Sequence, residues 1–109
     1  MNGKGDANGE VARALAELRW DSASVVVARG FLARLLGFTA YGRDAAMSRR
    51  LVLVFPHCNA VHTCFMRYPL NIAFLRGDGS VARVEKGVLP WRFRSCKAAA
   101  FTMERASGP

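Results

Sequence analysis

The sequence has few cysteines and no long apolar run. Three cysteines occur in 109 residues, so at least one thiol has no partner within the chain. This count excludes a disulfide-stapled secreted mini-protein and fits a reducing compartment. No apolar run approaches the roughly 20 residues of a membrane-spanning helix, and residues 1–20 have no apolar core of signal-peptide length. We therefore expect a cytoplasmic protein without a transmembrane segment.

Acidic residues are also scarce. The chain has 8 Asp and Glu against 16 Lys and Arg, which gives a formal net charge of +8. This surplus favours acidic partners, which include nucleic acid, anionic lipid headgroups and acidic proteins. The alternative is a solvated basic surface that only keeps the chain soluble. The length argues for one domain, in which 51% hydrophobic residues suffice for a core.

The N-terminal region has little that would pack. Residues 1–9 are polar and rich in Gly and Asn, which predicts a disordered tail. Val11, Leu15 and Leu18 then recur at helical spacing and predict a short helix over residues 10–20. We therefore expect a tail with a short helix over residues 1–20, and a single β-rich domain over residues 21–109.

A second helix is predicted over residues 29–37. The apolar side chains between residues 31 and 36 fall on one helical face, and Gly37 stands where a helix C-cap would lie. Residues 39–50 are polar and basic and have no continuous apolar pattern, which predicts a loop.

The rest of the chain is dominated by short strand-like segments. They lie at residues 24–28, 51–55, 59–66, 71–76 and 80–85. Residues 86–95 are expected to form a loop with two exposed aromatics, and residues 96–104 either a final strand or a short helix. Most connections are too short for parallel crossovers. The predicted class is α+β, mainly β: a small antiparallel curled sheet or partly open barrel of five to six strands, with one or two short helices.

Residues 55–76, FPHCNAVHTCFMRYPLNIAFLR, hold most of the unusual side chains. Side chains alternate between the two faces of a strand, so a regular strand over residues 59–66 would place five of them together. These are Cys58, Ala60, His62, Cys64 and Met66. Apolar strands on both sides predict that this strand is central. His62 would then be mostly buried, neutral, and hydrogen-bonded to a backbone carbonyl or to the segment 90–96.

Several motifs together carry a family resemblance. They are residues 29–37, the apolar strand with Pro56, VHTCFMRYPLN at residues 61–71, Asp78-Gly79, Pro90-Trp91-Arg92, and residues 96–104 with Cys96 and Glu104. The chain resembles an uncharacterised bacterial and archaeal family, the domain of unknown function numbered 192. The resemblance covers residues 25–104 and implies a compact β-rich domain with no established enzyme activity; some relatives look exported.

The chain departs from that family's pattern at two places. Asn71 stands where the family usually has Asp, which weakens any role for a carboxylate there. Typical members also continue past the late Glu with another strand. Because this chain stops at Pro109, the resemblance implies that its last strand is truncated.

A metal site is one interpretation of the Cys and His residues. Its ligands would be Cys58, His62 and Cys64, with Cys96 as a distant fourth. Thiolate and imidazole groups suit zinc, and soft sulfur ligands suit Cu(I). However, no CxxC pair is present, and free Cys commonly packs as a small hydrophobe, so the structural interpretation is favoured. We expect no cofactor.

A Cys–His nucleophilic pair is the enzymatic interpretation. Cys58 or Cys96 would act with His62, and the cations near Cys96 would favour a thiolate. Nothing in the sequence supplies an oxyanion hole or a third orienting residue. We therefore assign no catalytic residue, and an enzyme is the least favoured hypothesis.

Nucleic-acid binding is the second hypothesis. Residues 91–94, WRFR, alternate aromatic and cationic side chains, as single-strand binders do. Arg43, Arg49 and Arg50 would extend the basic patch. The alternative is that Trp91 and Phe93 close one end of the barrel while the arginines stay solvated.

The main hypothesis is a small non-enzymatic binding or accessory domain. Its pocket or partner surface would comprise His62, Thr63, Met66, Arg67, Trp91 and Arg92. An Arg beside an aromatic ring suits a carboxylate or phosphate group, so the expected partner is an acidic small ligand or an acidic protein.

Overall fold

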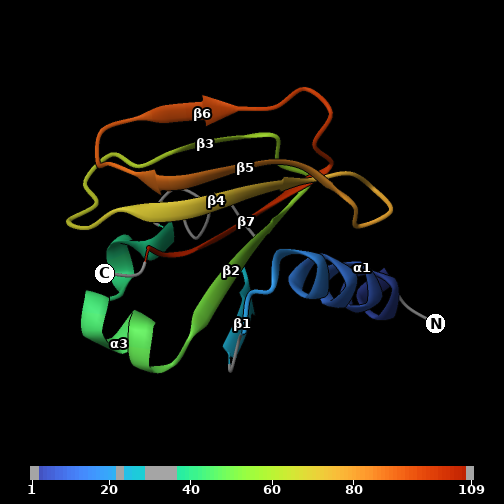
Figure 1. The fold of residues 1–109 in the computed structure, drawn as a ribbon, viewed down its shortest axis with the longest axis horizontal. Helices are drawn as coiled ribbons and strands as arrows, with labels where there is room; N and C mark the ends of the chain where they lie inside the picture. Colours follow the sequence, from blue (N-terminus) through green and yellow to red (C-terminus); the bar gives the residue numbers. More distant parts are fainter. Residues whose placement is uncertain (1–2, 22–23, 29–36, 108–109) are drawn as a thin grey trace.

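A five-stranded sheet with the strand order β1-β2-β7-β4-β5 forms the centre of the fold (Figure 1). The structure is a computed structural model and describes residues 3–21, 24–28 and 37–107. The main strands are β1 (Ser24–Val27), β2 (Leu51–Pro56), β4 (Leu70–Leu75), β5 (Val81–Val88) and β7 (Phe101–Ala106). A second, two-stranded sheet consists of β3 (Ala60–His62) and β6 (Phe93–Ser95). The helical segments are α1 (Gly3–Leu18), η1 (Gly37–Ala40) and α3 (Arg43–Ser48).

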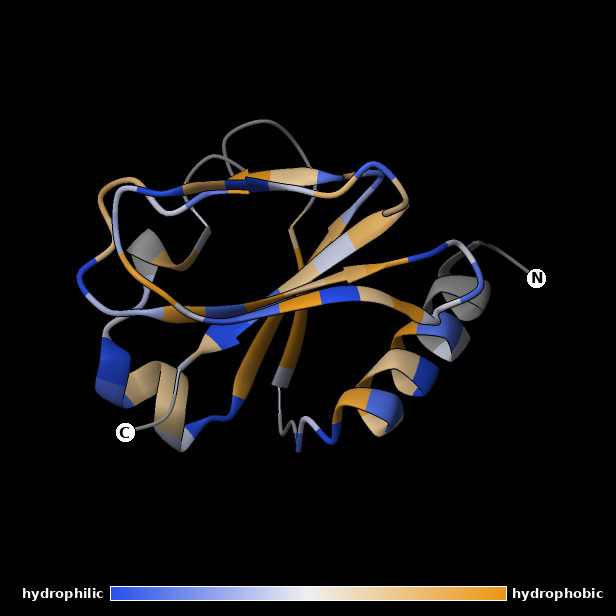
Figure 2. Cartoon of the chain, turned by 45° about the horizontal axis from the view of Figure 1, so that its top comes forward, coloured by the Kyte–Doolittle hydropathy of each residue, from blue (hydrophilic) through white to orange (hydrophobic). Residues whose placement is uncertain are grey.

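The inner strands β2, β7 and β4 are buried on both faces, which explains why β2 and β4 are almost continuously apolar. On β2, Leu53 and Phe55 pack into one core, whereas Val52 and Val54 pack into the other. The two-stranded sheet and α3 cover the first core, and α1 covers the second through Val11 and its neighbours. Figure 2 shows hydrophobic colouring concentrated along these central strands.

The predicted class, α+β and mainly β, is confirmed. Seven strands occur among the described residues, one more than the upper limit expected, and the main sheet is curled and does not close. The pairs β2–β7, β4–β7 and β4–β5 are antiparallel, whereas β1 and β2 are parallel, with Ser24 opposite Leu51. The chain between β1 and β2 is long enough for the crossover that a parallel pair needs. No helix in the described ranges is long and apolar enough to cross a membrane.

The prediction of a central strand over residues 59–66 is wrong. Only Ala60–His62 is extended, and it pairs with β6 outside the main sheet. The chain turns at once after His62, and Phe65 has a φ of 68°, so the alternation of faces stops there. The central strand is β7, between β2 and β4. Residues 96–100, which precede β7, are rich in alanine, so the sequence did not decide between a strand and a helix over residues 96–104.

Three other segments differ from expectation. Residues 43–48 form α3 instead of a loop, because Ala45, Ala46 and Met47 favour a helix and Ala46 packs into the core. The expected loop over 86–95 is shorter, since β5 continues to Val88 and β6 begins at Phe93. Helix α1 begins at Gly3, earlier than the helix expected from residue 10. The helix predicted over 29–37 lies outside the described residues except for Gly37, whose φ is 48°.

Candidate functional site

Thr63 joins the turn after β3 to the loop before β6. Its side chain is 1% exposed, and its hydroxyl donates a hydrogen bond to the Leu89 carbonyl at 2.7 Å. The same oxygen accepts one from the Arg92 backbone N–H at 2.8 Å. The Thr63 backbone N–H donates to the Arg92 carbonyl at 2.8 Å, and its carbonyl accepts from the Trp91 N–H at 3.1 Å. One buried residue therefore fixes the backbone of the Pro90-Trp91-Arg92 segment.

His62 does not occupy the position predicted for it. Its side chain is only partly buried, and its Nδ1 accepts a hydrogen bond from the Cys64 backbone N–H at 3.2 Å. The prediction that its ring bonds to a carbonyl or to the segment 90–96 is therefore wrong. Because the strand ends at His62, strand geometry does not force its ring into the core. Thr63 makes the buried contacts that were expected of His62.

Phe65 and Trp91 form an exposed aromatic pair with unusual backbone geometry. Their side chains are 67% and 60% exposed, and their ring centroids are 4.7 Å apart. Both residues have positive φ angles, 68° and 65°, a conformation that bulky side chains rarely adopt. Such a conformation costs on the order of 1–3 kcal/mol and persists only when its surroundings impose it. The Thr63 hydrogen bonds supply that constraint for Trp91.

Two further apolar side chains are exposed within two residues of Trp91. Leu89 is 52% exposed and Phe93 is 65% exposed. We call Phe65, Leu89, Trp91 and Phe93 the aromatic surface. The alternative that Trp91 and Phe93 close one end of a barrel is wrong, because both rings lie in water and the sheet does not close.

Three arginines stand within two residues of the exposed rings in the sequence. Arg67 and Arg92 are exposed, and the Arg92 guanidinium donates to the carbonyls of Pro90 and Trp91 at 3.2 and 3.5 Å. Arg94 forms an ion pair with Glu85, in which its Nε lies 3.6 Å from a carboxylate oxygen. The guanidinium of Arg92 therefore keeps its charge available beside the exposed rings.

The structure brings together only part of the site predicted from the sequence. Thr63, Trp91 and Arg92 are hydrogen-bonded neighbours. Met66, expected to wall a pocket, is 7% exposed and belongs to the hydrophobic core. The exposed Phe65 was missed because strand alternation assigned it to the apolar, buried face. Nothing in the sequence pattern alone signals its left-handed backbone.

The three cysteines are free thiols. Cys58 is buried, and its Sγ donates to the Ala60 carbonyl at 3.1 Å, whereas Cys64 and Cys96 are partly buried. Across residues 3–21, 24–28 and 37–107, no three His, Cys, Asp or Glu side chains gather into a group able to hold a metal ion. The four ligands considered in the sequence, including His62, are thus not brought together.

Asn71 has a structural contact that suits its amide. Its Oδ1 accepts a hydrogen bond from the Gly87 N–H at 2.9 Å, and Gly87 has a φ of 62°. The contact lies at the register shift between β4 and β5 around Leu70 and Ile72. A neutral carbonyl oxygen is sufficient for it.

Glu104 is a buried acid that the sequence did not single out as a site. It is 3% exposed on β7, opposite Leu53 on one side and Ile72 on the other. Burial raises the pKa of Glu104 to about 8. Its signal in the sequence is an acidic residue inside the apolar alternation of a strand. A strongly shifted pKa marks a candidate functional group, but structural burial produces the same shift.

The sequence profile of an uncharacterised family, described as DUF192, uncharacterized ACR, matches residues 14–108. The chain belongs to the DUF192 family. Two motifs of the family resemblance, VHTCFMRYPLN and Pro90-Trp91-Arg92, are the segments that Thr63 joins. No protein of curated function shows significant similarity to this DUF192 chain.

A solved structure has the same fold. It is the crystal structure of a protein of unknown function from Novosphingobium aromaticivorans, with a TM-score of 0.58 and 17% sequence identity. The alignment covers 77% of the DUF192 chain and 63% of the other chain, so this chain spans less than two thirds of that protein. At this identity the similarity supports the fold alone.

Proposed function

We propose that this domain is a small non-enzymatic binding module that engages an acidic protein segment through the aromatic surface. One observation carries the proposal: the rings of Phe65 and Trp91 are held in water, in contact with each other, on backbone that is strained. Strain of this kind accompanies ligand clamps and switch segments more often than ordinary surface loops.

A partner that covers these rings removes their apolar surface from water and so stabilises the complex. Aromatic side chains dominate interface energetics because they bury large apolar areas with few rotatable bonds. The Thr63 network holds the loop of Trp91 in place before any partner arrives. A surface that is already ordered loses less entropy on binding.

Charge indicates the chemistry of the partner. The exposed Arg92 follows Trp91 directly in the chain, the exposed Arg67 stands two residues after Phe65, and the chain carries a net charge of +8. Guanidinium groups recognise carboxylates through paired hydrogen bonds. The segment that fits is therefore an acidic one with at least one apolar side chain to cover the rings.

The test is selection of random twelve-residue peptides on the immobilised domain, followed by affinity measurement of the enriched peptides. We expect enrichment of Asp and Glu together with apolar residues. The double variant Phe65→Asn, Trp91→Asn should bind them roughly tenfold or more weakly, as for interface hot spots. Asn tolerates the left-handed backbone, so the loop geometry is retained.

Val25→Asn is the matched control, because it removes an apolar side chain that is 44% exposed on β1. Equal loss of affinity in the control and in the double variant would contradict the proposal, as would enrichment of peptides with no acidic residues.

Single-stranded nucleic acid is a second candidate. The observation in its favour is that Trp91 and Phe93 are exposed and alternate with Arg92 and Arg94. Bases stack on exposed aromatic rings, and arginines pair with phosphates. The ion pair of Arg94 with Glu85 reduces the charge available for phosphates, so the acidic protein segment is favoured.

A further inference from the structure

The main sheet has two outer strands, β1 and β5, and their free edges differ in protection (Figure 1). A free edge leaves backbone N–H and C=O groups unpaired, and proteins commonly protect it with charged side chains and bulges. β5 has both: Arg83, Glu85 and Lys86 lie along it, and its register against β4 shifts twice. β1 has the sequence Ser-Val-Val-Val and a regular register against β2. The unprotected edge is therefore that of β1.

The direction of the backbone hydrogen bonds alternates along β1. The Ala28 N–H donates to the Val54 carbonyl at 2.8 Å. In a parallel pair every second residue bonds to the neighbouring strand, and the residues between them point their N–H and C=O groups the other way. Val26 therefore bonds to β2, as Ala28 does, whereas Val25 and Val27 point these groups to the free edge. In the described part of the chain, no strand pairs with that edge.

The side chains of Val25 and Val27 are also exposed. They are 44% and 37% exposed, whereas Val26 packs against the first core. The register places Val25 and Val27 opposite Val52 and Val54, which belong to the second core. The two exposed valines therefore extend the apolar face of the second core to the edge of the sheet.

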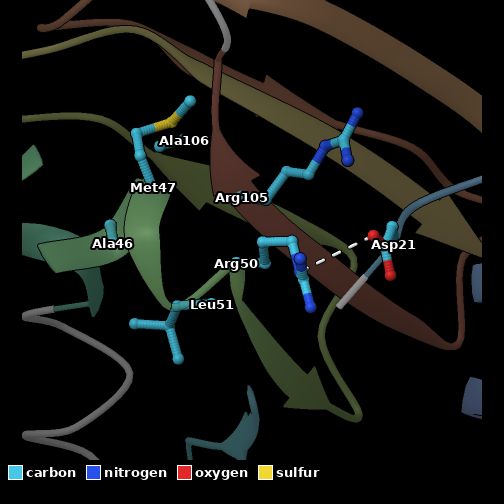
Figure 3. Close-up of a pocket in the computed structure, with 7 residues that line it drawn as sticks. All are labelled: Asp21, Ala46, Met47, Arg50, Leu51, Arg105 and Ala106. Atoms are coloured by element: carbon cyan, nitrogen blue, oxygen red, sulfur yellow. Dashed lines mark ion pairs between the residues drawn. The ribbon is translucent and has the colours of Figure 1, made fainter. Parts of the chain in front are cut away.

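The residues just before β1 are anchored. Trp20 is 5% exposed and packs into the second core, and the guanidinium carbon of Arg105 lies 4.8 Å from its ring centroid. The Asp21 Oδ2 lies 3.6 Å from the Nε of Arg50, the dashed line in Figure 3. An exposed ion pair adds little stability, so Trp20 is the main anchor. An edge that is ordered before it meets a partner loses less entropy on binding.

β1 is complementary to a second copy of itself. When two copies run antiparallel with Val26 opposite Val26, Val25 of each copy lies opposite Val27 of the other. Both residues of such a pair point their N–H and C=O groups at the free edge, so the pair exchanges two hydrogen bonds. The two-fold symmetry generates this pair twice. The other registers that oppose outward-pointing groups use only one of the two exposed valines of each copy.

We propose that two copies of this chain associate through β1, antiparallel about a two-fold axis at Val26, so that the main sheet continues across the dimer. The exposed valines then cover one another on one face of the joined sheet. The charges and register shifts on β5 prevent growth at the outer edges, so association ends at the dimer. β1 contributes no residue to the aromatic surface, so this inference is independent of the proposed function.

The size of the contact sets the expected affinity. A four-residue strand buries less than the roughly 800 Å² per partner of a standard interface. We therefore expect a Kd between about 1 µM and 1 mM. The experiment is sedimentation equilibrium of the full chain from about 5 µM to about 1 mM, which should show a single monomer–dimer equilibrium. A chain that stays monomeric throughout, or that assembles beyond the dimer, would overturn the proposal.

Two matched double variants locate the interface. They are Val25→Lys, Val27→Lys on β1, and Leu89→Lys, Phe93→Lys on the aromatic surface. Each replaces two exposed apolar side chains and adds the same charge, so general repulsion between copies is equal. We expect the Kd of the β1 variant to rise roughly tenfold or more above that of the aromatic-surface variant. Equal dimerisation of the two variants, or greater weakening in the aromatic-surface variant, would overturn β1 as the interface.

A second measurement covers the case in which the β1 variant does not fold, and it also tests the register. Amide hydrogen exchange of the unsubstituted chain is measured by NMR at low and at high concentration. The Val26 N–H should be protected at both concentrations, because it bonds to β2. The Val25 and Val27 N–H groups should exchange more slowly only at high concentration. Exchange at Val25 and Val27 that does not depend on concentration would overturn the strand pairing, even where a dimer forms.

Discussion

Thr63 and Arg92 exchange two hydrogen bonds, one from each backbone N–H. The Thr63 N–H donates to the Arg92 carbonyl, and the Arg92 N–H donates to the Thr63 hydroxyl oxygen, both at 2.8 Å. Thr63 is almost fully buried, whereas Arg92 is exposed. The pair therefore connects the packed interior to the strained loop that carries Trp91. The proposed binding surface depends on this connection rather than on its own packing.

Replacing Thr63 by Val tests the connection with a side chain of nearly the same shape. The Arg92 N–H and the Leu89 carbonyl would each lose a buried partner. We expect the free energy of unfolding to fall by about 1–3 kcal/mol, the usual cost of an unsatisfied buried polar group. Urea unfolding measures it. Thr63→Ser is the control, because it keeps the hydroxyl; a Val variant as stable as the parent would contradict the role of Thr63.

His62→Ala should have a smaller effect than Thr63→Val. The His62 ring is only partly buried and accepts one hydrogen bond, from the Cys64 N–H. Because Cys64 lies in a turn, water reaches its N–H more readily than it would in a strand. We expect a loss of stability below about 1 kcal/mol in the same unfolding assay. A loss equal to that of Thr63→Val would show that the imidazole is more deeply engaged than its exposure indicates.

The strands with the strongest patterns were predictable from the sequence. LVLVF before Pro56 and the segment 71–76 are apolar enough that only buried strands accommodate them, and β2 and β4 lie there. The turn Gly77-Asp78-Gly79 also predicted the hairpin of β4 and β5, in which the Asp78 carboxylate accepts from the Ser80 N–H at 2.9 Å. In these segments the local pattern and the tertiary packing favour the same structure.

The site could be predicted only in part, because its geometry depends on contacts between distant segments. Pro90-Trp91-Arg92 and Thr63 were both identified as parts of the surface, but the hydrogen bond that joins them was assigned to His62 instead of Thr63. The error came from extending β3 through residue 66. The exposed Phe65 follows from tertiary geometry, which residue spacing does not encode.

Nucleic-acid binding should be weak and sensitive to salt. Arg92 and Arg94 can pair with only a few phosphates, and dissolved salt ions compete with each of these pairs. We expect measurable binding of single-stranded RNA or DNA only at low salt. The measurement compares the parent with Arg92→Ala, Arg94→Ala at low and moderate salt. Binding that survives moderate salt and collapses in the double variant would favour the nucleic-acid candidate over an acidic protein segment.

Purified protein should carry no stoichiometric zinc or copper. Cys58 donates its thiol hydrogen to the Ala60 carbonyl, and the His62 Nδ1 accepts from the Cys64 N–H. Both groups would have to give up these hydrogen bonds to bind an ion. Elemental analysis after expression in metal-supplemented medium measures the content. A ratio near one ion per chain that disappears in His62→Ala would contradict this expectation and make Cys58 and Cys64 ligands.

Glu104 should make the protein less stable as the pH rises. Burial raises its pKa in the folded state to about 8, from an ordinary value of 4.5. Between these values the folded chain holds a proton that the unfolded chain has released. The stabilisation is therefore complete below about pH 4.5 and disappears as the pH rises through about 8, with a slope of at most about 1.4 kcal/mol per pH unit.

The test compares urea unfolding of the parent and of Glu104→Gln at about pH 5, 6.5 and 8. The amide is nearly isosteric with the protonated acid and does not titrate, so we expect the variant to lose most of the downward slope. Glu17→Gln is the control, since it removes an exposed carboxylate from α1 and should leave the slope unchanged. A Glu104→Gln variant with the parent's slope would mean that another group titrates. The buried acid would then have to be ionised in the folded state, with a cation or hydrogen-bond donor stabilising it.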